Sequence, residues 1–404
     1  MAARRGACLT KIQLLLLAAL ALPCAALALP GAALPASSAA PAPVGARLPS
    51  AERAPIALLA DLTAGQVLFA RQADITFLPA SMTKAMTALV AFDLIDAGKL
   101  DENTIVTISP DLAKRWSGRG TTLNLQAGER VSVHDLLMGA AIVSGNDAAA
   151  ALGEAALGSE AAWLAAMNAR AAQLGMTASH FATANGFPDQ GRTYVTAADM
   201  VRLAAALIEQ HPALYRRYFG QNTMVWRGTE LQSHNPIIGV VPGADGIKTG
   251  HTFEAGYNFL GAVERGGRRL VLVTGRSWTG PDRAAAAAAL AEWGYAAWDS
   301  RSFLAAGTVV GQANVQNGDA RTVALAVPRA YTLAVVRDSD PAVRGRISYH
   351  GPLRAPIAAG QLVAQLELQV PGQPPHTIPL VTQRSVAVAG PIDRIVNCLL
   401  ELAT

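Results

Sequence analysis

The chain has 404 residues, of which 51% are hydrophobic and 15% are charged, and its formal net charge is +4. This length allows two folded domains with tails, and the composition is that of a globular protein. Three positive charges, at Arg4, Arg5 and Lys11, lie in the first 28 residues, which hold no acidic residue. Without them the net charge falls from +4 to +1, so a nucleic-acid partner is not indicated.

The first 28 residues have the organisation of a secretory signal peptide. A basic start is followed by an apolar run at residues 12–22 and by a small-residue cleavage site, Ala26-Leu27-Ala28. An uncleaved membrane anchor is the less favoured reading, because Pro23 shortens the run below the roughly 20 residues of a membrane span. Residues 29–53 are rich in Ala and Pro, which is typical of an extended linker. We therefore expect export to the periplasm or another extracytoplasmic compartment.

The next segments predict a hairpin followed by helices. Residues 55–70 form two apolar runs around a Thr-Ala-Gly turn. From residue 81 to about 94 the pattern is helical and apolar on almost every face, which indicates a helix in the core. A second helix is predicted at residues 133–143, with Ser132 as its cap and Asp135 three residues on. Further helices are expected at 160–174 and 197–208.

Strands dominate the rest of the chain. The runs at 246–249, 257–264 and 268–274 predict successive strands, and the Ala-rich run 283–298 predicts a helix. Residues 54–300 therefore predict an α+β domain whose sheet is completed by distant segments. Residues 301–390 alternate in short runs and predict a small all-β domain, and residues 391–404 predict a short amphipathic helix. Because Arg394 is its only cation, this helix would make weak peripheral membrane contact or dock on the protein.

Three short motifs occur in the order of one plan of serine acyl transfer: Ser81-Met82-Thr83-Lys84, Ser144-Gly145-Asn146 and Lys248-Thr249-Gly250. Each motif alone is weak evidence, because such pairs and turns are common. Lysine usage strengthens the case: the chain has five lysines against 28 arginines, and two of the five fall in these motifs. Together the motifs predict an active-site serine enzyme.

The spacing of the first motif indicates a nucleophile and its base. Residues three apart on a helix share a face, so Lys84 can reach the Ser81 hydroxyl and activate it. A lysine acts as a base only when neutral, and both apolar burial and the charge of Lys248 lower the pKa of Lys84. Arginine could not serve, because it keeps its proton. Ser144 would relay a proton to the leaving amine, and Asn146 would hold Lys84 and a substrate carbonyl.

The third motif predicts the binding of a substrate with a free carboxylate. Lys248, on an edge strand, would offer a positive charge, and Thr249 would add a hydroxyl donor. Gly250 would let the backbone approach closely. The amides of Ser81 and His251 are candidates for the oxyanion hole. This chemistry needs no cofactor or metal, and metallopeptidase motifs are absent from the sequence.

On these motifs the chain resembles the low-molecular-mass penicillin-binding proteins, which are serine-type D-alanyl-D-alanine carboxypeptidases. The resemblance covers residues 54–390 and is carried by further segments at 78–87, 175–177, 196–200, 234–236, 245–252, 351–357 and 379–381. It implies a β-lactamase/transpeptidase-like catalytic domain and acylation of Ser81. The expected activity is removal of the terminal D-alanine from peptidoglycan stem pentapeptides, with covalent inhibition by β-lactam antibiotics.

Other functions share these motifs in part. A D,D-endopeptidase would carry the same three motifs. A class A β-lactamase would need a glutamate with an asparagine four residues on as its deacylating group, and no such pair between Ser144 and Lys248 fits. A non-catalytic wall-binding scaffold would be favoured by the loss of a motif, and none is lost.

Overall fold

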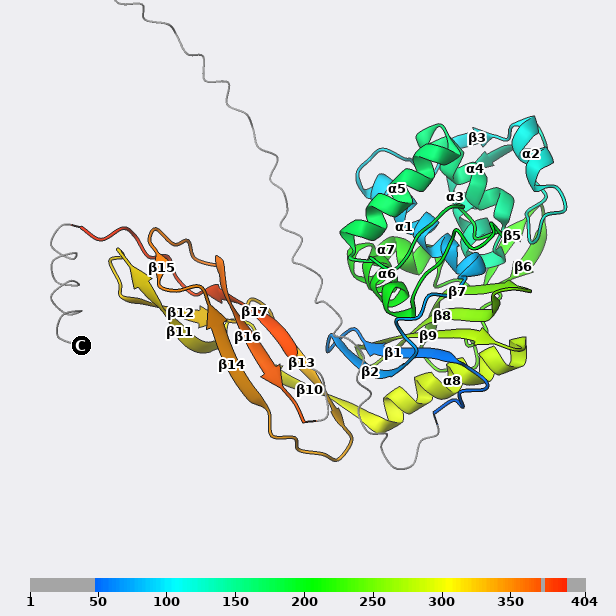
Figure 1. Cartoon of the computed structure of the whole chain (residues 1–404). Helices are drawn as coiled ribbons and strands as arrows, with labels where there is room; N and C mark the ends of the chain where they lie inside the picture. The colour runs from blue at the N-terminus through cyan, green and yellow to red at the C-terminus, as the bar shows by residue number, and fades with distance from the viewer. Residues whose placement is uncertain (1–47, 372–374, 391–404) are drawn as a thin grey trace, which may run out of the picture. The chain divides into compact units, whose positions relative to one another are not determined.

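The computed structural model describes residues 48–371 and 375–390 (Figure 1). The predicted signal peptide, most of the predicted linker and the predicted helix at 391–404 lie outside these residues. Among the described helices, none is long and apolar enough to cross a membrane.

The catalytic domain is built on a five-stranded antiparallel sheet. Its strand order is β2-β1-β9-β8-β7. The strands are β1 (Ile56–Asp61), β2 (Gln66–Arg71), β7 (Ala244–Thr252), β8 (Gly256–Arg265) and β9 (Arg268–Ser277). The predicted hairpin is confirmed, and β1 pairs with β9, so distant segments complete the sheet as expected. This order leaves β7 at one edge.

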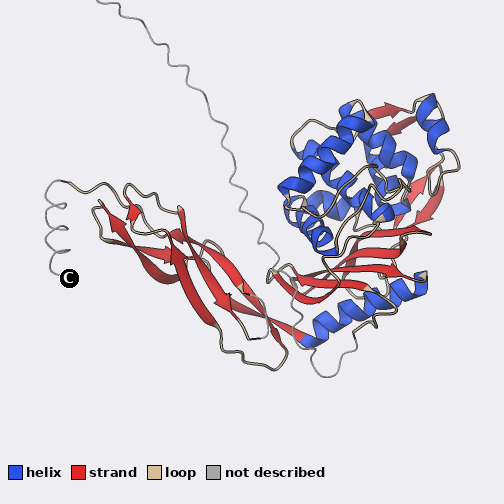
Figure 2. Cartoon of the chain, in the orientation of Figure 1, coloured by secondary structure: helices blue, strands red, loops and turns tan. Residues whose placement is uncertain are grey.

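Both faces of the sheet are covered, as Figure 2 shows, by α8 (Gly280–Ala297) on one side and the other helices on the opposite side. Successive side chains of a strand point to opposite faces. In β1, the side chains of Ile56 and Leu58 therefore belong to the hydrophobic core between the sheet and the helices opposite α8. The side chain of Leu59 belongs to the other core, which includes Leu290 of α8. An apolar strand such as β1 is thus buried on both faces.

The main group of helices surrounds α1 (Lys84–Asp96), which is preceded by a 3₁₀ turn, η1 (Ala80–Thr83). It contains α2 (Pro110–Trp116), α3 (Val133–Met138), the π-helical turn η2 (Gly139–Val143), α4 (Asn146–Leu157), α5 (Glu160–Gln173), α6 (Ala197–Gln210) and α7 (Pro212–Tyr218). The predicted cap is present: the Ser132 hydroxyl oxygen accepts the backbone N–H of Asp135 at 3.0 Å. The short helices α2 and α7 were not predicted, because runs this brief show no periodicity.

Two small hairpins were also not predicted, namely β3 (Ile105–Thr107) with β4 (Arg130–Ser132), and β5 (Thr223–Trp226) with β6 (Thr229–Gln232).

The second domain is all β in its described residues. It has a two-stranded sheet of β10 (Trp298–Leu304) and β13 (Tyr331–Val336). Its six-stranded sheet contains β11 (Val309–Gln316), β12 (Thr322–Ala326), β14 (Arg344–Tyr349), β15 (Leu353–Arg354), β16 (Leu362–Gln369) and β17 (His376–Thr382). In β16 the buried residues Ala364, Leu366 and Leu368 alternate with polar ones, which explains why the alternation predicted a strand.

One buried ion pair joins three elements of the catalytic domain. The Arg268 Nε atom of β9 donates to the Asp61 carboxylate of β1 at 2.7 Å, and the Asp61 side chain is 0% exposed. The same guanidinium donates to the carbonyls of Gly294, at 3.2 Å, and Trp298, at 2.6 Å, at the end of α8. The pair therefore fastens the sheet to the helix that covers it.

Replacing Asp61 by Ala should lower the free energy of unfolding by about 3–5 kcal/mol, because it leaves the buried Arg268 charge uncompensated. The measurement is denaturant unfolding of the exported chain. The matched control is Glu292→Ala, which breaks a more exposed pair with Arg265 and should cost about 1 kcal/mol or less. A loss in Asp61→Ala no larger than that of the control would contradict this role.

Candidate active site

The structure brings Ser81 and Lys84 into direct contact. Ser81 lies on the 3₁₀ turn η1, immediately before α1, and not inside a regular α-helix as its pattern predicted. The Lys84 Nζ atom lies 2.9 Å from the Ser81 Oγ atom. It also donates to the Oδ1 atom of Asn146 at 2.7 Å and to the backbone carbonyl of Asn185 at 2.8 Å. These three contacts account for every hydrogen and lone pair of a neutral amine.

The direction of the contact with Ser81 depends on the protonation state of Lys84, because an ammonium group would donate to all three oxygens whereas a neutral amine has two hydrogens to donate. Carbonyl oxygens only accept hydrogen bonds, so Asn146 and Asn185 take the two hydrogens of a neutral Lys84 amine. The remaining lone pair then faces the Ser81 hydroxyl, which donates to it. This is the arrangement required for Lys84 to remove the hydroxyl proton.

Burial and charge both favour the neutral form of Lys84. The side chain is 1% exposed. Burial lowers the pKa of Lys84 well below the ordinary lysine value, and the nearby Lys248 charge lowers it further, whereas Asp147 acts in the opposite direction. The Asp147 carboxylate is held by backbone N–H groups of Leu123, at 2.9 Å, and Leu125, at 3.0 Å.

The second motif lies at a connection between helices. Ser144 follows the π-helical turn η2 with φ of 70°, in the left-handed region, and Asn146 begins α4. The Asn146 Nδ2 atom donates to the carbonyl of Arg119 at 2.9 Å. This bond orients the amide so that its oxygen faces Lys84. Ser144 is 4% exposed.

The third motif lies on the edge strand β7, beside the nucleophile. A Cβ atom on Gly250 would lie 2.1 Å from the carbonyl oxygen of Pro79, so only glycine allows β7 to approach η1 this closely. Lys248 is buried, and burial, followed by the charge of Arg283, lowers its pKa to about 7. Its Nζ atom donates to the carbonyl of Thr249 at 3.3 Å. The structure therefore brings the Lys-Thr-Gly motif next to the turn that carries Ser81.

The structure adds Arg283, which sequence reasoning missed. Arg283 lies in the first turn of α8, with its guanidinium 5.5 Å from the centre of the Tyr257 ring. The same ring stacks on the imidazole of His251 with a centroid separation of 3.9 Å. Burial and the Arg283 charge lower the pKa of His251. The Arg283 Nε atom is buried without a hydrogen-bond partner among the described residues, so this guanidinium has donor capacity to spare.

Asn185 was also missed. Besides accepting from Lys84, it donates from its Nδ2 atom to the carbonyl of Asn146 at 3.1 Å. The next residue, Gly186, has φ of 76°, and a Cβ atom there would lie 1.8 Å from the carbonyl oxygen of Ala80. The Asn-Gly pair was a usable signal, because it is typical of a turn that needs positive φ. The residues that contact Asn185 could not be predicted from the sequence pattern.

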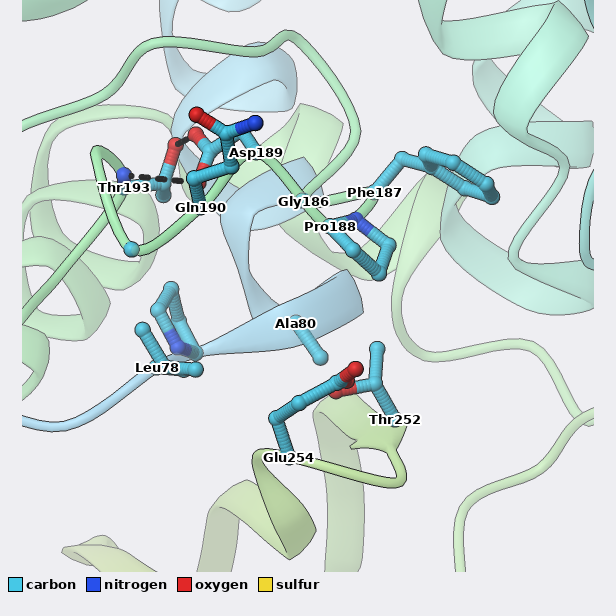
Figure 3. Close-up of a pocket in the computed structure, with 12 residues that line it drawn as sticks. Leu78, Ala80, Gly186, Phe187, Pro188, Asp189, Gln190, Thr193, Thr252 and Glu254 are labelled. Carbon is cyan, nitrogen blue, oxygen red and sulfur yellow. Dashed lines mark hydrogen bonds between the residues drawn. The ribbon is translucent and has the colours of Figure 1, made fainter.

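A cavity of about 390 Å³ opens beside Ala80, the residue that precedes Ser81 (Figure 3). It is lined by Leu78, Pro79 and Ala80 from the entry to η1, by the segment 186–191 with Thr193, and by Thr252 and Glu254 at the end of β7. Among the described residues, no group of three or more His, Cys, Asp or Glu side chains could hold a metal ion.

Comparison with known proteins identifies the class to which this fold and site belong. A profile described as D-alanyl-D-alanine carboxypeptidase matches residues 44–276, and one described as Penicillin-binding protein 5, C-terminal domain, matches residues 298–388. D-alanyl-D-alanine carboxypeptidase DacD of Salmonella typhimurium is 32% identical over 346 residues, covering 84% of this chain and 87% of the relative.

Solved structures agree with this match. Penicillin-binding protein 5 of Haemophilus influenzae superposes with a TM-score of 0.76 at 28% identity, covering 85% of this chain and all of that one. Penicillin-binding protein D2 of Listeria monocytogenes, solved in an ampicillin-bound form, gives 0.53 at 29% identity over 62% of this chain and 99% of its own. The chain belongs to the serine D-alanyl-D-alanine carboxypeptidase family of penicillin-binding proteins.

The pH dependence of substrate capture should report on Lys248. A substrate carboxylate is attracted to Lys248 only while the amine is protonated, and its pKa is about 7. We expect kcat/KM for a D-Ala-D-Ala peptide to fall as the pH rises through that value. In Lys248→Arg the charge persists, so this alkaline fall should move to higher pH, whatever the loss in absolute rate.

The matched control for this prediction is Lys99→Arg, a change at an exposed lysine outside the site, which should keep the wild-type profile. An unchanged alkaline fall in Lys248→Arg would show that another group causes it.

Proposed function

We propose that this carboxypeptidase releases the terminal D-alanine of peptidoglycan stem pentapeptides through an acyl-enzyme on Ser81. The observation that carries the proposal is the environment of the Lys84 amine. Its Nζ atom lies 2.9 Å from the nucleophile, and two carbonyl oxygens accept its hydrogens. This arrangement supports Lys84 as the general base of acylation.

Acylation would proceed by proton transfer from the Ser81 hydroxyl to Lys84, with attack of Oγ on the carbonyl of the penultimate D-alanine. The backbone N–H groups of Ser81 and His251 would stabilise the resulting oxyanion, a contribution of about 3–4 kcal/mol per donor in other serine enzymes. Ser144 would pass a proton to the leaving amine, which departs as D-alanine. Water would then hydrolyse the ester on Ser81.

Substrate binding would use the free edge of the sheet. As the edge strand, β7 can pair with an extended peptide. The terminal carboxylate would lie at Lys248 and Thr249, and Arg283 would strengthen the positive potential there. The Arg283 charge lowers the pKa of Lys248.

The same site would be acylated by β-lactam antibiotics. The Listeria relative was solved in its ampicillin-bound form, and the motif residues that would contact such a molecule are all present here. Rapid turnover of the penicillin adduct is not expected, because the buried carboxylates bordering the site are already engaged. Asp147 is held by backbone N–H groups, and Asp189 accepts from the backbone N–H and hydroxyl of Thr193 at 3.2 and 2.6 Å.

We also propose limits of 54–300 for the catalytic domain and 301–390 for the β domain, after a signal peptide at 1–28 and a linker at 29–53. The basic start and apolar run support export. Residues 391–404 would make weak peripheral membrane contact through their apolar face. Membrane fractionation of exported chains with and without this segment tests that contact. A full-length chain that is already soluble would refute it.

Ser81→Ala should abolish labelling by fluorescent penicillin and lower D-alanine release from a diacyl-Lys-D-Ala-D-Ala peptide by at least about 1,000-fold, because the nucleophile is lost. Lys84→Arg should also be inactive, since a guanidinium cannot take the proton. Peptide mapping of the adduct is the direct measurement.

The matched control for the nucleophile is Ser385→Ala, at an exposed serine of the β domain, which should label like the wild type. An undiminished adduct in Ser81→Ala, or an adduct mapped to another residue, would overturn the proposal.

A further inference from the structure

The cavity beside Ala80 has apolar walls and an acidic group at its edge. Leu78, Pro79 and Ala80 form one wall, and Phe187 and Pro188 form another. Figure 3 shows the Glu254 side chain below these walls, with its carboxylate turned toward Thr252 and Ala80. The cavity volume of about 390 Å³ is sufficient for a long aliphatic side chain.

Glu254 differs from the other carboxylate of the cavity in having no hydrogen-bond or ion-pair partner among residues 48–371 and 375–390. Asp189 is 9% exposed, and Thr193 donates to both of its oxygens. Glu254 is exposed, and within the described part of the chain no hydrogen bond or ion pair engages it. The cavity lining includes no lysine or arginine. Glu254 is therefore free to attract a cation.

Two arginines lie near this region but contact other groups. The Arg192 Nε atom donates to the backbone carbonyl of Asp189 at 3.1 Å. The Arg119 guanidinium lies 4.8 Å from the centre of the Phe187 ring. Neither arginine forms an ion pair with Glu254 among the described residues, and neither lines the cavity.

The position of Glu254 along the chain places it on the acyl side of the scissile bond. A strand advances about 3.4 Å per residue. With the terminal carboxylate at Lys248 and Thr249 and the scissile carbonyl at His251, a peptide extended along β7 continues toward Thr252 and Glu254. The residues that precede the two D-alanines therefore meet the cavity.

We propose that Glu254 binds a cationic amino group on the side chain of the residue that precedes D-Ala-D-Ala, with the aliphatic part of that side chain against the apolar walls. This inference rests on the proposed function, because it uses the direction of the peptide along β7. The ligand class is a stem peptide whose diamino acid carries a free ammonium group. Stems whose amine is acylated, as in a cross-link, lack the charge and bind less well.

The test compares two substrates that differ only in this charge. One is α-acetyl-Lys-D-Ala-D-Ala, with a free side-chain ammonium, and the other is the diacetyl peptide. The wild-type enzyme should favour the charged peptide in kcat/KM by about three- to tenfold at low salt, and less at high salt. In Glu254→Gln this ratio should fall to near 1, and in Glu254→Lys it should fall below 1.

The matched control is Glu367→Gln, which removes the same charge from an exposed position in the β domain and should keep the wild-type ratio. A wild-type ratio of 1, or an unchanged ratio in Glu254→Gln, overturns the proposal. Penicillin labelling of Ser81 is followed in every variant. Loss of labelling in the wild type would contradict the proposed function itself, whereas labelling with a ratio of 1 contradicts only the role of Glu254.

Discussion

The burial of the Lys84 amine is the constraint on which the catalytic site depends. The side chain is 1% exposed. An ammonium group is costly in such surroundings, so the neutral amine is favoured. The side-chain oxygen of Asn146 and the backbone oxygen of Asn185 accept the hydrogens of the amine.

Two glycines allow the surrounding elements to approach this lysine. Gly250 lets β7 pack against η1, and Gly186 leaves room for the carbonyl of Ala80. Without these approaches the edge strand could not present Lys248 beside the nucleophile. In the proposed function this sheet edge would bind the substrate, because the backbone groups of an edge strand can pair with another chain.

Much of this architecture could be predicted from local pattern. The β1–β2 hairpin and the alternating strand β16 follow from side-chain periodicity, and the Ser81–Lys84 contact follows from helical spacing. The 3₁₀ form of η1 could not be predicted, because a turn of four residues shows no periodicity of its own. Strand β14 was missed since its residues are mostly exposed and polar. Asn185 and Arg283 reach the site only through tertiary folding, which sequence spacing does not report.

The most direct test of the account is the protonation state of Lys84. The mature chain would hold only four lysines, so NMR of Cε-labelled lysine, with the Lys84→Arg variant for assignment, can follow each amine through a pH titration. The structure predicts that the Lys84 signal titrates well below the ordinary lysine range, because burial and the Lys248 charge lower its pKa. An ammonium signal that persists to the ordinary lysine range would contradict Lys84 as the base.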